Sequence, residues 1–243
     1  MIIVLITTVI IFPLLSRSGN NDQSLTEQVV VQPIDEQLSD EAAMKETDID
    51  EAFSLENVQG SCVRVQANGH HGSGIIFKMT EDEMIIATNR HVLQYWDEDS
   101  YVTFFNGAVG NGRAVALSEK ADVGFISIYT AFLTEEERKD LRAVDTVDEP
   151  PGVGTKIYMI DMASDVWNPM VYEGKVLEPQ RYLEDFEMEM LYGEAASKPG
   201  MSGTGVFDVN GQFLGMLTGG TDANEIAAVP TMVLDEEYER TEQ

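Results

Sequence analysis

The sequence has 243 residues, with 15 Lys and Arg against 43 Asp and Glu, which gives a formal net charge of −28 at pH 7. This balance argues against nucleic-acid binding and against adsorption on an anionic membrane surface, because both need clustered basic residues. The hydrophobic fraction of 43% is ordinary for a chain that buries a core, and the single cysteine, Cys62, excludes an intramolecular disulfide and a cysteine-based zinc site.

The first segment, Met1 to Leu15, carries no charged side chain and consists mostly of Ile, Val, Leu and Thr. An apolar run of about 10–14 residues is typical of a signal peptide, whereas a membrane-spanning helix needs about 20. Ser16 and Ser18 then offer small residues with the spacing of a signal-peptidase site. Residues 1–18 are therefore expected to be a signal peptide or a membrane anchor. The rest of the chain is expected to be extracytoplasmic, either anchored to the cell membrane or secreted.

Residues 19–56 are expected to form an acidic flexible linker. Acidic side chains recur along them against a single lysine, Lys45, and their only apolar run is Val29–Val31. Because like charges repel and little apolar surface is available for burial, such a composition favours an extended tether. The alternative is an acidic docking segment.

Short runs of β-forming residues recur from residue 57 to 238, which we take as one globular domain followed by a tail at 239–243. Many short strands at roughly even spacing favour a β-barrel or sandwich over a parallel sheet with crossover helices. Thr134–Arg142 is the one clear helix, because Thr134 can cap it and Glu137 follows three residues later. Asn210-Gly211 indicates a two-residue hairpin turn. The expected strands are Cys62–Ala67, Gly74–Met79, Met84–Thr88, Tyr101–Phe105, Gly112–Leu117, Val123–Tyr129, Lys156–Asp161, Val171–Leu177, Glu187–Tyr192, Gly205–Val209, Gln212–Thr218 and Ile226–Val233.

Three positions in this β-rich region could carry chemistry. His91 follows a strand, Asp122 directly precedes an apolar strand, and Ser202 lies on a tight turn between Gly200 and Gly203. Glycine allows the backbone to point consecutive N–H groups into one concavity, and acyl transfer needs such a concavity for the negative charge of its tetrahedral intermediate. Each position alone also fits a plain structural role, as a surface histidine, a turn aspartate or a glycine-rich turn.

Together, and in this order, the three residues supply the parts of a serine nucleophile. A serine hydroxyl is a poor nucleophile unless a base removes its proton, and that base must be held in one tautomer by an acid. The chain provides His91, then Asp122, then Ser202, in the order that this chemistry takes in one well-known class of enzyme. The order and rough spacing resemble the trypsin/chymotrypsin superfamily, in which His and Asp come from the first barrel and Ser from the second.

The sequence resembles HtrA/Deg-like bacterial serine proteases more closely still, over residues 62–233. This resemblance implies an all-β fold of two packed antiparallel six-stranded β-barrels, trypsin-like, with the active site in the cleft between them. It implies no metal, no organic cofactor and, in this chain, no PDZ domain. The blocks that carry the resemblance are His70–Ile76, Thr88–Val92, Ala121–Val123, Gly200–Gly203, Asn210–Met216 and Ile226–Pro230.

The same resemblance assigns the catalytic roles of a serine endopeptidase. Ser202 would attack the scissile carbonyl, and His91 would act first as general base and then as general acid. Asp122 would orient His91 and stabilise its charged form. The backbone N–H groups of Gly200 and Ser202 would form the oxyanion hole.

The sequence departs from these relatives on either side of Ser202. Many relatives read Ser-Gly-Gly-Pro from the nucleophile onward, whereas this chain places Thr204 where the second glycine would be. In the digestive relatives, an Asp directly before the nucleophile pairs with a newly cut N-terminal amine. Here that position is Met201, which has no charge to pair. A buried ammonium without a partner is costly, so no zymogen step of that kind is expected.

Substrate preference follows from the residues before the nucleophile. In the superfamily that the sequence resembles, the residue six positions before the nucleophile often lies at the base of the primary specificity pocket. The resemblance therefore implies this place for Ala196, with Lys198 and Thr218 as further substrate-binding residues. Because position 196 has no carboxylate to attract Lys or Arg, small or medium apolar side chains are favoured before the scissile bond. Lys198 makes acidic side chains the alternative. The expected partners are protein or peptide substrates, with no nucleic acid and with the membrane contacted only through the N-terminal segment.

Other interpretations stay open on the sequence alone. A catalytically silent trypsin-like module could bind peptides or proteins at the cell surface, and an acidic adhesion or scaffold protein is a third interpretation. His70 and His71 could bind a metal ion, although no cluster of partner ligands is evident and a surface turn is favoured. Cys62 could act as a nucleophile with His91, although its apolar alternating run favours a buried position.

Overall fold

The computed structural model describes residues 53–118, 120–147 and 149–241. The expected signal peptide or anchor at 1–18, and residues 19–52 of the expected linker, lie outside the described residues. Among the helices of the described part, none combines the length and the apolar character needed to cross a membrane.

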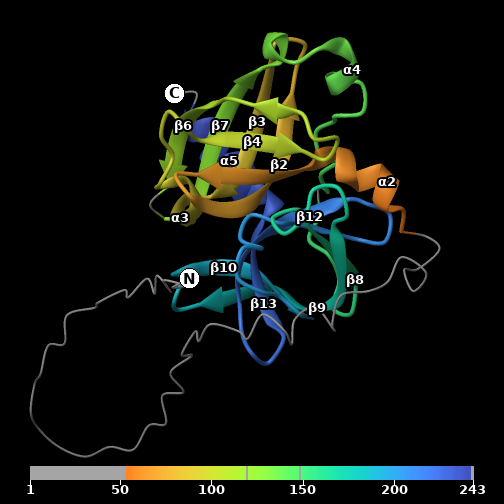
Figure 1. The fold of residues 1–243 in the computed structure, drawn as a ribbon. Coiled ribbons are helices and arrows are strands. Elements are labelled where there is room, and N and C mark those ends of the chain that lie inside the picture. Colours follow the sequence, from red (N-terminus) through yellow and green to blue (C-terminus); the bar gives the residue numbers. More distant parts are fainter. Residues whose placement is uncertain (1–52, 119, 148, 242–243) are drawn as a thin grey trace, which may run out of the picture. The chain divides into compact units, whose positions relative to one another are not determined.

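The first half of the domain is a seven-stranded antiparallel sheet in the order β5-β4-β1-β2-β3-β7-β6 (Figure 1). Its two edge strands, β5 and β6, are consecutive in the chain and separated by only two residues, so the sheet must curl to bring its edges together. No ladder joins β5 to β6 among the described residues, so the expected closed six-stranded barrel is wrong for this half: it is a curled half-barrel of seven strands. Its strands are β1 (Cys62–Ala67), β2 (His70–Met79), β3 (Glu83–Asn89), β4 (Tyr101–Phe104), β5 (Val109–Gly110), β6 (Arg113–Ser118) and β7 (Val123–Tyr129).

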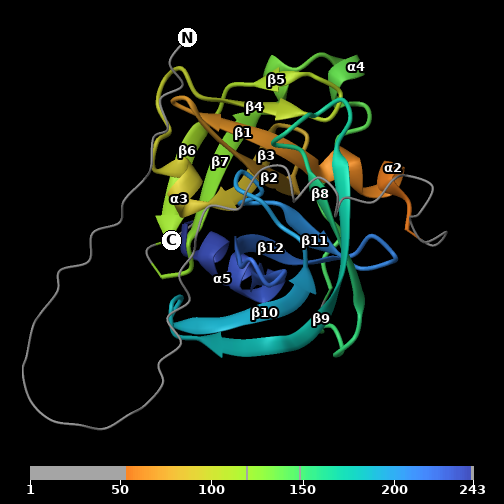
Figure 2. The ribbon, with the colours of Figure 1, turned by 60° about the horizontal axis from the view of Figure 1, so that its bottom comes forward.

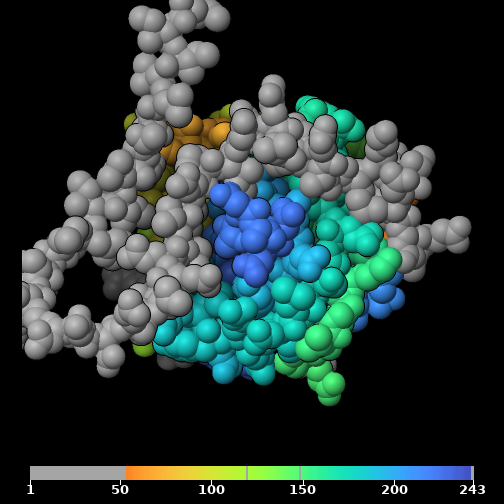
Figure 3. Space-filling view, turned by 90° about the horizontal axis from the view of Figure 1, so that it is seen from below, coloured from red at the N-terminus to blue at the C-terminus, as the bar shows by residue number. Residues whose placement is uncertain are grey.

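The second half is a closed six-stranded barrel in the order β10-β13-β12-β11-β8-β9, which confirms the expectation for this half. Closure removes the unpaired strand edges that would otherwise invite pairing with another chain. Seen from below, the surface is formed mainly by this barrel, coloured teal to blue (Figure 3). Its strands are β8 (Lys156–Asp161), β9 (Met170–Leu183), β10 (Met188–Ala195), β11 (Gly205–Phe207), β12 (Phe213–Gly220) and β13 (Glu225–Pro230).

Helices occupy short connections, except for the last one. The helix α4 (Glu135–Arg138) has the expected capping box between Thr134 and Glu137, but it ends four residues before the expected Arg142. The longest helix, α5 (Thr231–Thr241), includes residues 239–241, which the sequence had placed in a tail. The other short helices are α2 (Leu55–Val58), η3 (Gln59–Ser61), α3 (Arg90–Leu93) and η4 (Thr130–Phe132).

The turn between β11 and β12 is longer than the two-residue hairpin that Asn210-Gly211 indicated. The Asp208 carboxylate accepts the backbone N–H of Asn210 at 2.9 Å and that of Gln212 at 2.8 Å. The Asp208 side chain thus accepts backbone N–H groups inside the turn, and strand pairing resumes at Phe213, opposite Phe207. Of the two turn residues, only Gly211 has a positive φ, at 79°.

Three apolar clusters stabilise the domain, one inside each half and one between them. The cluster between the halves joins Phe77 and Phe125 of the sheet to Tyr158 and Phe213 of the barrel, and all four side chains are fully buried. Tyr238 of α5 packs edge-on against Phe125 with a ring-centroid separation of 5.4 Å, so the C-terminal helix also bridges the halves (Figure 2). Burying each such side chain contributes roughly 1.5–3 kcal/mol, so the contact between the halves adds to the stability of the whole domain.

The connection between the halves is hydrogen-bonded to both of them. The N–H of Val144 donates to the carbonyl of Ile76 in β2 at 2.9 Å, and the next residue, Asp145, accepts the N–H of Phe213 in β12 at 2.7 Å. Thr146 then forms an isolated parallel bridge with Phe213. Consecutive residues of this connecting segment, Val144 and Asp145, therefore bond to the two halves in turn.

The domain's packing begins at Phe53, within the range that the sequence assigned to the linker. Phe53 is 5% exposed and stacks on Tyr158 of β8, with ring centroids 4.2 Å apart. Val58 is also buried, and the Arg142 guanidinium donates to the carbonyl of Glu56. Residues 53–58 are therefore part of the folded structure rather than of a solvated tether.

Candidate active site

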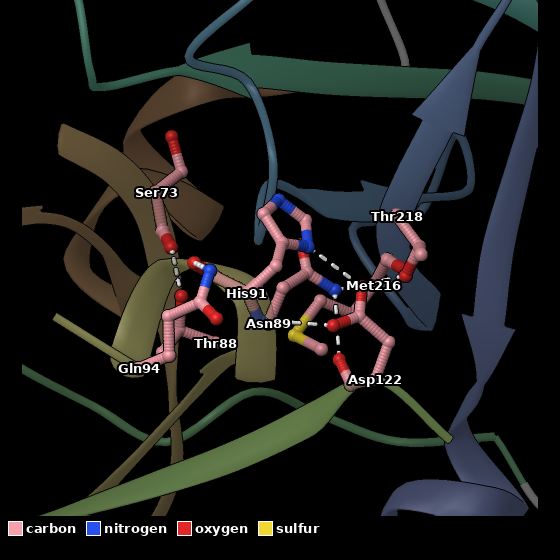
Figure 4. A network of polar contacts seen from close by, with 8 residues as sticks. All are labelled: Ser73, Thr88, Asn89, His91, Gln94, Asp122, Met216 and Thr218. Atoms are coloured by element: carbon pink, nitrogen blue, oxygen red, sulfur yellow. Dashed lines mark hydrogen bonds and ion pairs between the residues drawn. The ribbon is translucent and has the colours of Figure 1, made fainter. Parts of the chain in front are cut away.

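His91 and Asp122 meet where two neighbouring strands of the seven-stranded sheet, β3 and β7, end and begin, respectively. His91 lies in α3, directly after β3, and Asp122 lies in the turn between β6 and β7. The carboxylate contacts His91 twice: Oδ2 is 2.8 Å from Nδ1, and Oδ1 accepts the backbone N–H at 3.0 Å (Figure 4). Two bonds from one carboxylate fix both the position and the plane of the imidazole. The Asp122 side chain is 22% exposed and that of His91 45%, so the acid is sheltered while the ring stays accessible.

The backbone of Asp122 is held as firmly as its side chain. Its φ of 49° lies in the left-handed region, which aspartate and asparagine tolerate better than most residues. Its carbonyl accepts the N–H of Arg90 at 3.0 Å and the side-chain amide of Asn89 at 3.2 Å. Asn89 is fully buried, and its amide also donates to the Thr218 hydroxyl on β12 at 2.8 Å. Asn89 therefore ties the acid to the barrel, a role that its place in the Thr88–Val92 block could have suggested.

Ser202 lies on the loop at 196–204, between β10 and β11 of the barrel, and comes to the same junction. The N–H of Ser73 in β2 donates to the Ser202 carbonyl at 2.8 Å. A Cβ on Gly72 would lie 2.8 Å from Val92, the residue after His91, and 3.1 Å from the Ser202 carbonyl. Thus His91 and Asp122 come from the first half and Ser202 from the second, as the resemblance implied.

The structure shows no hydrogen bond from the Ser202 side chain to any described residue, the His91 ring included. Hydrogen bonds of this kind are often long without substrate and tighten when it binds.

Some backbone N–H groups of the 196–204 loop donate to backbone carbonyls. Met201 donates to the carbonyl of Lys198 at 3.2 Å, Gly203 to that of Leu217 at 2.9 Å, and Thr204 to that of Met201 at 2.9 Å. The N–H groups of Gly200 and Ser202 are among those of the loop that have no acceptor within the described part of the chain. These two are the donors that the sequence assigned to the oxyanion hole.

Thr204, the departure from the relatives' glycine, fits the structure without backbone strain. It is 1% exposed, and its φ is not positive. Its carbonyl accepts the N–H of Leu217 at 2.8 Å, while its hydroxyl, among the described residues, has no hydrogen-bond partner. The glycine that the geometry requires is the preceding one, Gly203, whose φ is 88°.

The expected substrate-binding residues lie on the loop and on β12. Ala196 is half-buried, and Thr218 is 8% exposed with its hydroxyl accepting from Asn89. A Cβ on Gly220 would overlap the Ser197 hydroxyl, so the loop and β12 approach closely there. Lys198 is turned inward and forms an ion pair with Asp161, at 3.4 Å between Nζ and Oδ2.

Two other residues weighed in the sequence take structural positions. Burial raises the pKa of the Cys62 thiol to about 12, and its Sγ donates to the carbonyl of Val58 at 3.5 Å. A thiol in that state is a poor nucleophile. His70 stacks on Tyr95 with ring centroids 3.9 Å apart. No group of three or more His, Cys, Asp or Glu side chains in the described ranges is arranged to hold a metal ion.

Comparison with known proteins identifies the family of the chain. The family model described as a trypsin-like peptidase domain matches residues 72–216, which is more than half of the chain. No curated protein matches the sequence.

Among solved structures, the chain is similar to Rv3671c from M. tuberculosis H37Rv, a serine-to-alanine mutant in an inactive form. The TM-score is 0.63 at 15% identity, covering 88% of this chain and 97% of that one. A structure of the Rv3671c protease, also in an inactive form, gives a TM-score of 0.62 at 15% identity, covering 88% of this chain and 100% of that one. At this identity the likeness concerns the fold. From the family match and this fold together, the chain belongs to the trypsin-like peptidase domain family.

Proposed function

We propose that the protein is a serine endopeptidase of the HtrA/Deg-like type, which cleaves peptide bonds through a Ser-His-Asp triad and an acyl-enzyme intermediate. The observation that carries this proposal is the double contact of the Asp122 carboxylate with His91, at 2.8 Å to Nδ1 and 3.0 Å to the backbone N–H. An imidazole held in this way keeps its proton on Nδ1 and leaves Nε2 able to accept one.

The proposed reaction uses residues of both halves. The Ser202 hydroxyl attacks the scissile carbonyl carbon while His91 Nε2 accepts its proton. The negative charge moves to the former carbonyl oxygen, where the N–H groups of Gly200 and Ser202 can receive it. His91 then protonates the leaving amine, and the C–N bond breaks. Water repeats the sequence on the acyl-enzyme, with His91 again as base, and restores Ser202.

Labelling with a fluorophosphonate probe tests this proposal, because only an activated serine reacts. We expect the full chain to label, and Ser202→Ala and His91→Ala to lose both labelling and peptide hydrolysis. The double variant should be little worse than either single one, because triad members act as a unit. His70→Ala is the matched control and should keep activity. A folded wild-type protein that neither labels nor hydrolyses would instead favour a catalytically silent peptide-binding module.

Activation by a newly cut N-terminus is not part of the proposed mechanism. Met201 is 1% exposed and packs in the apolar cluster of the barrel, where an ammonium would have no partner on that side chain. Chains that begin at Gly19, Asp40 and Phe53 are therefore expected to show similar kcat/KM values on one peptide. Activity that appears after only one of these truncations would contradict the proposal.

For the residue before the scissile bond, we propose a small apolar side chain. Position 196 is an alanine, and the Ser197 hydroxyl lies against Gly220, which narrows the space between the loop and β12. The inward pairing of Lys198 with Asp161 supports this preference over the acidic alternative. A library of peptides that varies only this position should show its highest kcat/KM for Ala or Val. A preference for Asp or Glu would reverse the assignment.

For localisation, the proposal is that the catalytic domain works outside the cytoplasm. It rests on the uncharged Met1–Leu15 run in the sequence. Digestion of the domain by added protease would support it, in cells whose outer layers have been removed and whose cytoplasmic membrane is intact. Retention of the membrane-bound protein after carbonate extraction would distinguish an anchor from a cleaved signal.

A further inference from the structure

A buried ion pair connects the 196–204 loop to the end of β8. Asp161, the last residue of β8, is 1% exposed in its side chain, and Lys198 is 8% exposed. The Asp161 carboxylate also accepts the N–H groups of Ala163 and Ser164, at 2.9 and 3.3 Å, and the Ser164 hydroxyl at 2.7 Å. The acid is therefore fixed by its own segment, and Lys198 reaches it from the loop.

Such a pair is an inefficient way to stabilise a fold. Removing two charges from water carries a large desolvation penalty, and well-packed apolar residues often stabilise the same place as well or better. The pair does fix the orientation of the Lys198 side chain, because a buried charge that moves away from its partner loses that interaction.

Lys198 is the first residue of the turn that presents Gly200. The N–H of Met201 donates to the Lys198 carbonyl at 3.2 Å, Pro199 occupies the second position, and Gly200 the third with a φ of 96°. Pro followed by a residue with positive φ is the signature of a type II turn. Types I and II differ by a rotation of the central peptide through roughly 150–180°. The turn type therefore decides which way the Gly200 N–H points.

We propose that Asp161 and Lys198 are positioning residues that hold the 198–201 turn in its type II form, with the Gly200 N–H directed to the oxyanion. This inference rests on the proposed function, because the oxyanion hole belongs to that mechanism. Met201 brings no charge to this loop, and Lys198, three residues earlier, brings one that is anchored. Asp161 acts through Lys198 and touches no reacting atom.

The test compares Lys198→Met, Asp161→Asn and the double variant in the full chain. Each single variant should lower kcat about ten- to a hundred-fold with KM changed less than about threefold, since loss of one oxyanion donor costs up to a hundred- to a thousand-fold. Lys198→Met leaves the Asp161 carboxylate without this partner, so its thermal midpoint should fall most, and the double variant should recover stability. Under the proposal, kcat stays low in the double variant although stability returns.

Lys175→Met is the matched control. Lys175 pairs with Glu194 on the same barrel at 3.2 Å, but both side chains are about half exposed, at 50% and 53%. The same chemical change should leave kcat there unaltered. Recovery of kcat in parallel with stability in the double Asp161/Lys198 variant would overturn the proposal, as would a KM effect confined to Lys198→Met, which would assign Lys198 to substrate binding.

A crystal structure of the double variant gives a readout that does not need activity. We expect Gly200 to lose its positive φ in at least part of the molecules, and an unchanged type II turn would overturn the proposal. If the wild type does not react with the fluorophosphonate probe but the turn changes in the variant, the proposed protease function fails while the positioning role of the pair stands.

Discussion

The N–H of Ser73 donates to the carbonyl oxygen of Ser202 at 2.8 Å, and the carbonyl of the same Ser73 faces Gly203 so closely that a Cβ there would overlap it. Strand β2 and the loop that carries Ser202 are thus joined backbone to backbone. The Ser73 carbonyl also accepts the Thr88 hydroxyl at 2.7 Å, which fixes it from the other side. Neither partner can move to admit a side chain at position 203.

Gly203→Ala is therefore expected to lower the free energy of unfolding by more than about 3 kcal/mol and to abolish hydrolysis. A left-handed backbone costs an L-residue roughly 1–2 kcal/mol, and the overlap with the Ser73 backbone adds to it. Urea unfolding would measure the loss. Gly154→Ala is the matched control, because Gly154 has a φ of 82° and no atom within 4 Å of its Cβ position. Gly154→Ala should lower the free energy of unfolding by only about 1 kcal/mol. An equal loss in both variants would show that the Ser73 backbone moves aside to admit the side chain at position 203.

Asp122→Asn should preserve the fold and lower kcat by about 10⁴-fold. Asparagine tolerates the φ of 49° and keeps an oxygen for the His91 backbone N–H. Its amide, however, would donate toward Nδ1, which places the imidazole proton on Nε2. A protonated Nε2 cannot accept the proton of the Ser202 hydroxyl. Steady-state kinetics and circular dichroism on the same preparation would check both parts. A kcat within about tenfold of the wild type would contradict the role of Asp122.

The Cys62 thiol should not react in the folded protein at pH 8. Burial raises its pKa from 9.0 to about 12, because the apolar surroundings disfavour the thiolate. The folded state therefore holds this proton more tightly than the unfolded state. Any contribution of Cys62 to stability is full below pH 9 and decreases as the pH rises above it, since the unfolded thiol then ionises. Reaction with a chromogenic disulfide reagent should be absent in buffer and complete in guanidinium, and rapid reaction in buffer would show an exposed thiol.

Phe53→Ala should lower the free energy of unfolding by about 3 kcal/mol, as for other buried phenylalanines. Phe53 is 5% exposed and stacks on Tyr158, so its removal opens a gap against β8. Phe132→Ala is the control, because Phe132 is 72% exposed and should change stability by less than about 0.5 kcal/mol. Equal midpoints for Phe53→Ala and the wild type in a thermal scan would return residues 53–56 to the linker.

The closed barrel, most of the strands and the glycine-rich turn at Ser202 could be predicted because their signals are local. Alternating apolar residues indicate strands, and the glycines around Ser202 mark a turn whose φ values of 96° and 88° at Gly200 and Gly203 require them. The meeting of His91 with Asp122, 31 residues apart in the sequence, followed from the family resemblance rather than from any local pattern.

Other features depend on contacts that no local pattern records. The seven-stranded sheet includes β5, which has only two residues and is therefore too short to show an alternating pattern in the sequence. It is defined by its pairing with β4. The partnership of Asp161 with Lys198 was not predicted, although a lone acid between Ile160 and Met162 in an apolar run was a visible signal that a buried partner would be needed. The burial of Phe53 was hidden because its acidic neighbours set the composition of the whole segment.

Val144 and Asp145, in the segment that connects the two halves, are hydrogen-bonded to Ile76 and Phe213 respectively. These bonds have a consequence for how the protein unfolds. Neither half can unfold without removing hydrogen-bond partners from the segment that also completes the other half. Unfolding should therefore be one transition with coincident spectroscopic and calorimetric signals, despite two separate β-structures. For the same reason, a chimera that exchanges one half with a relative leaves one of the two halves hydrogen-bonded to a connecting segment from the other protein, whichever half keeps residues 144 and 145.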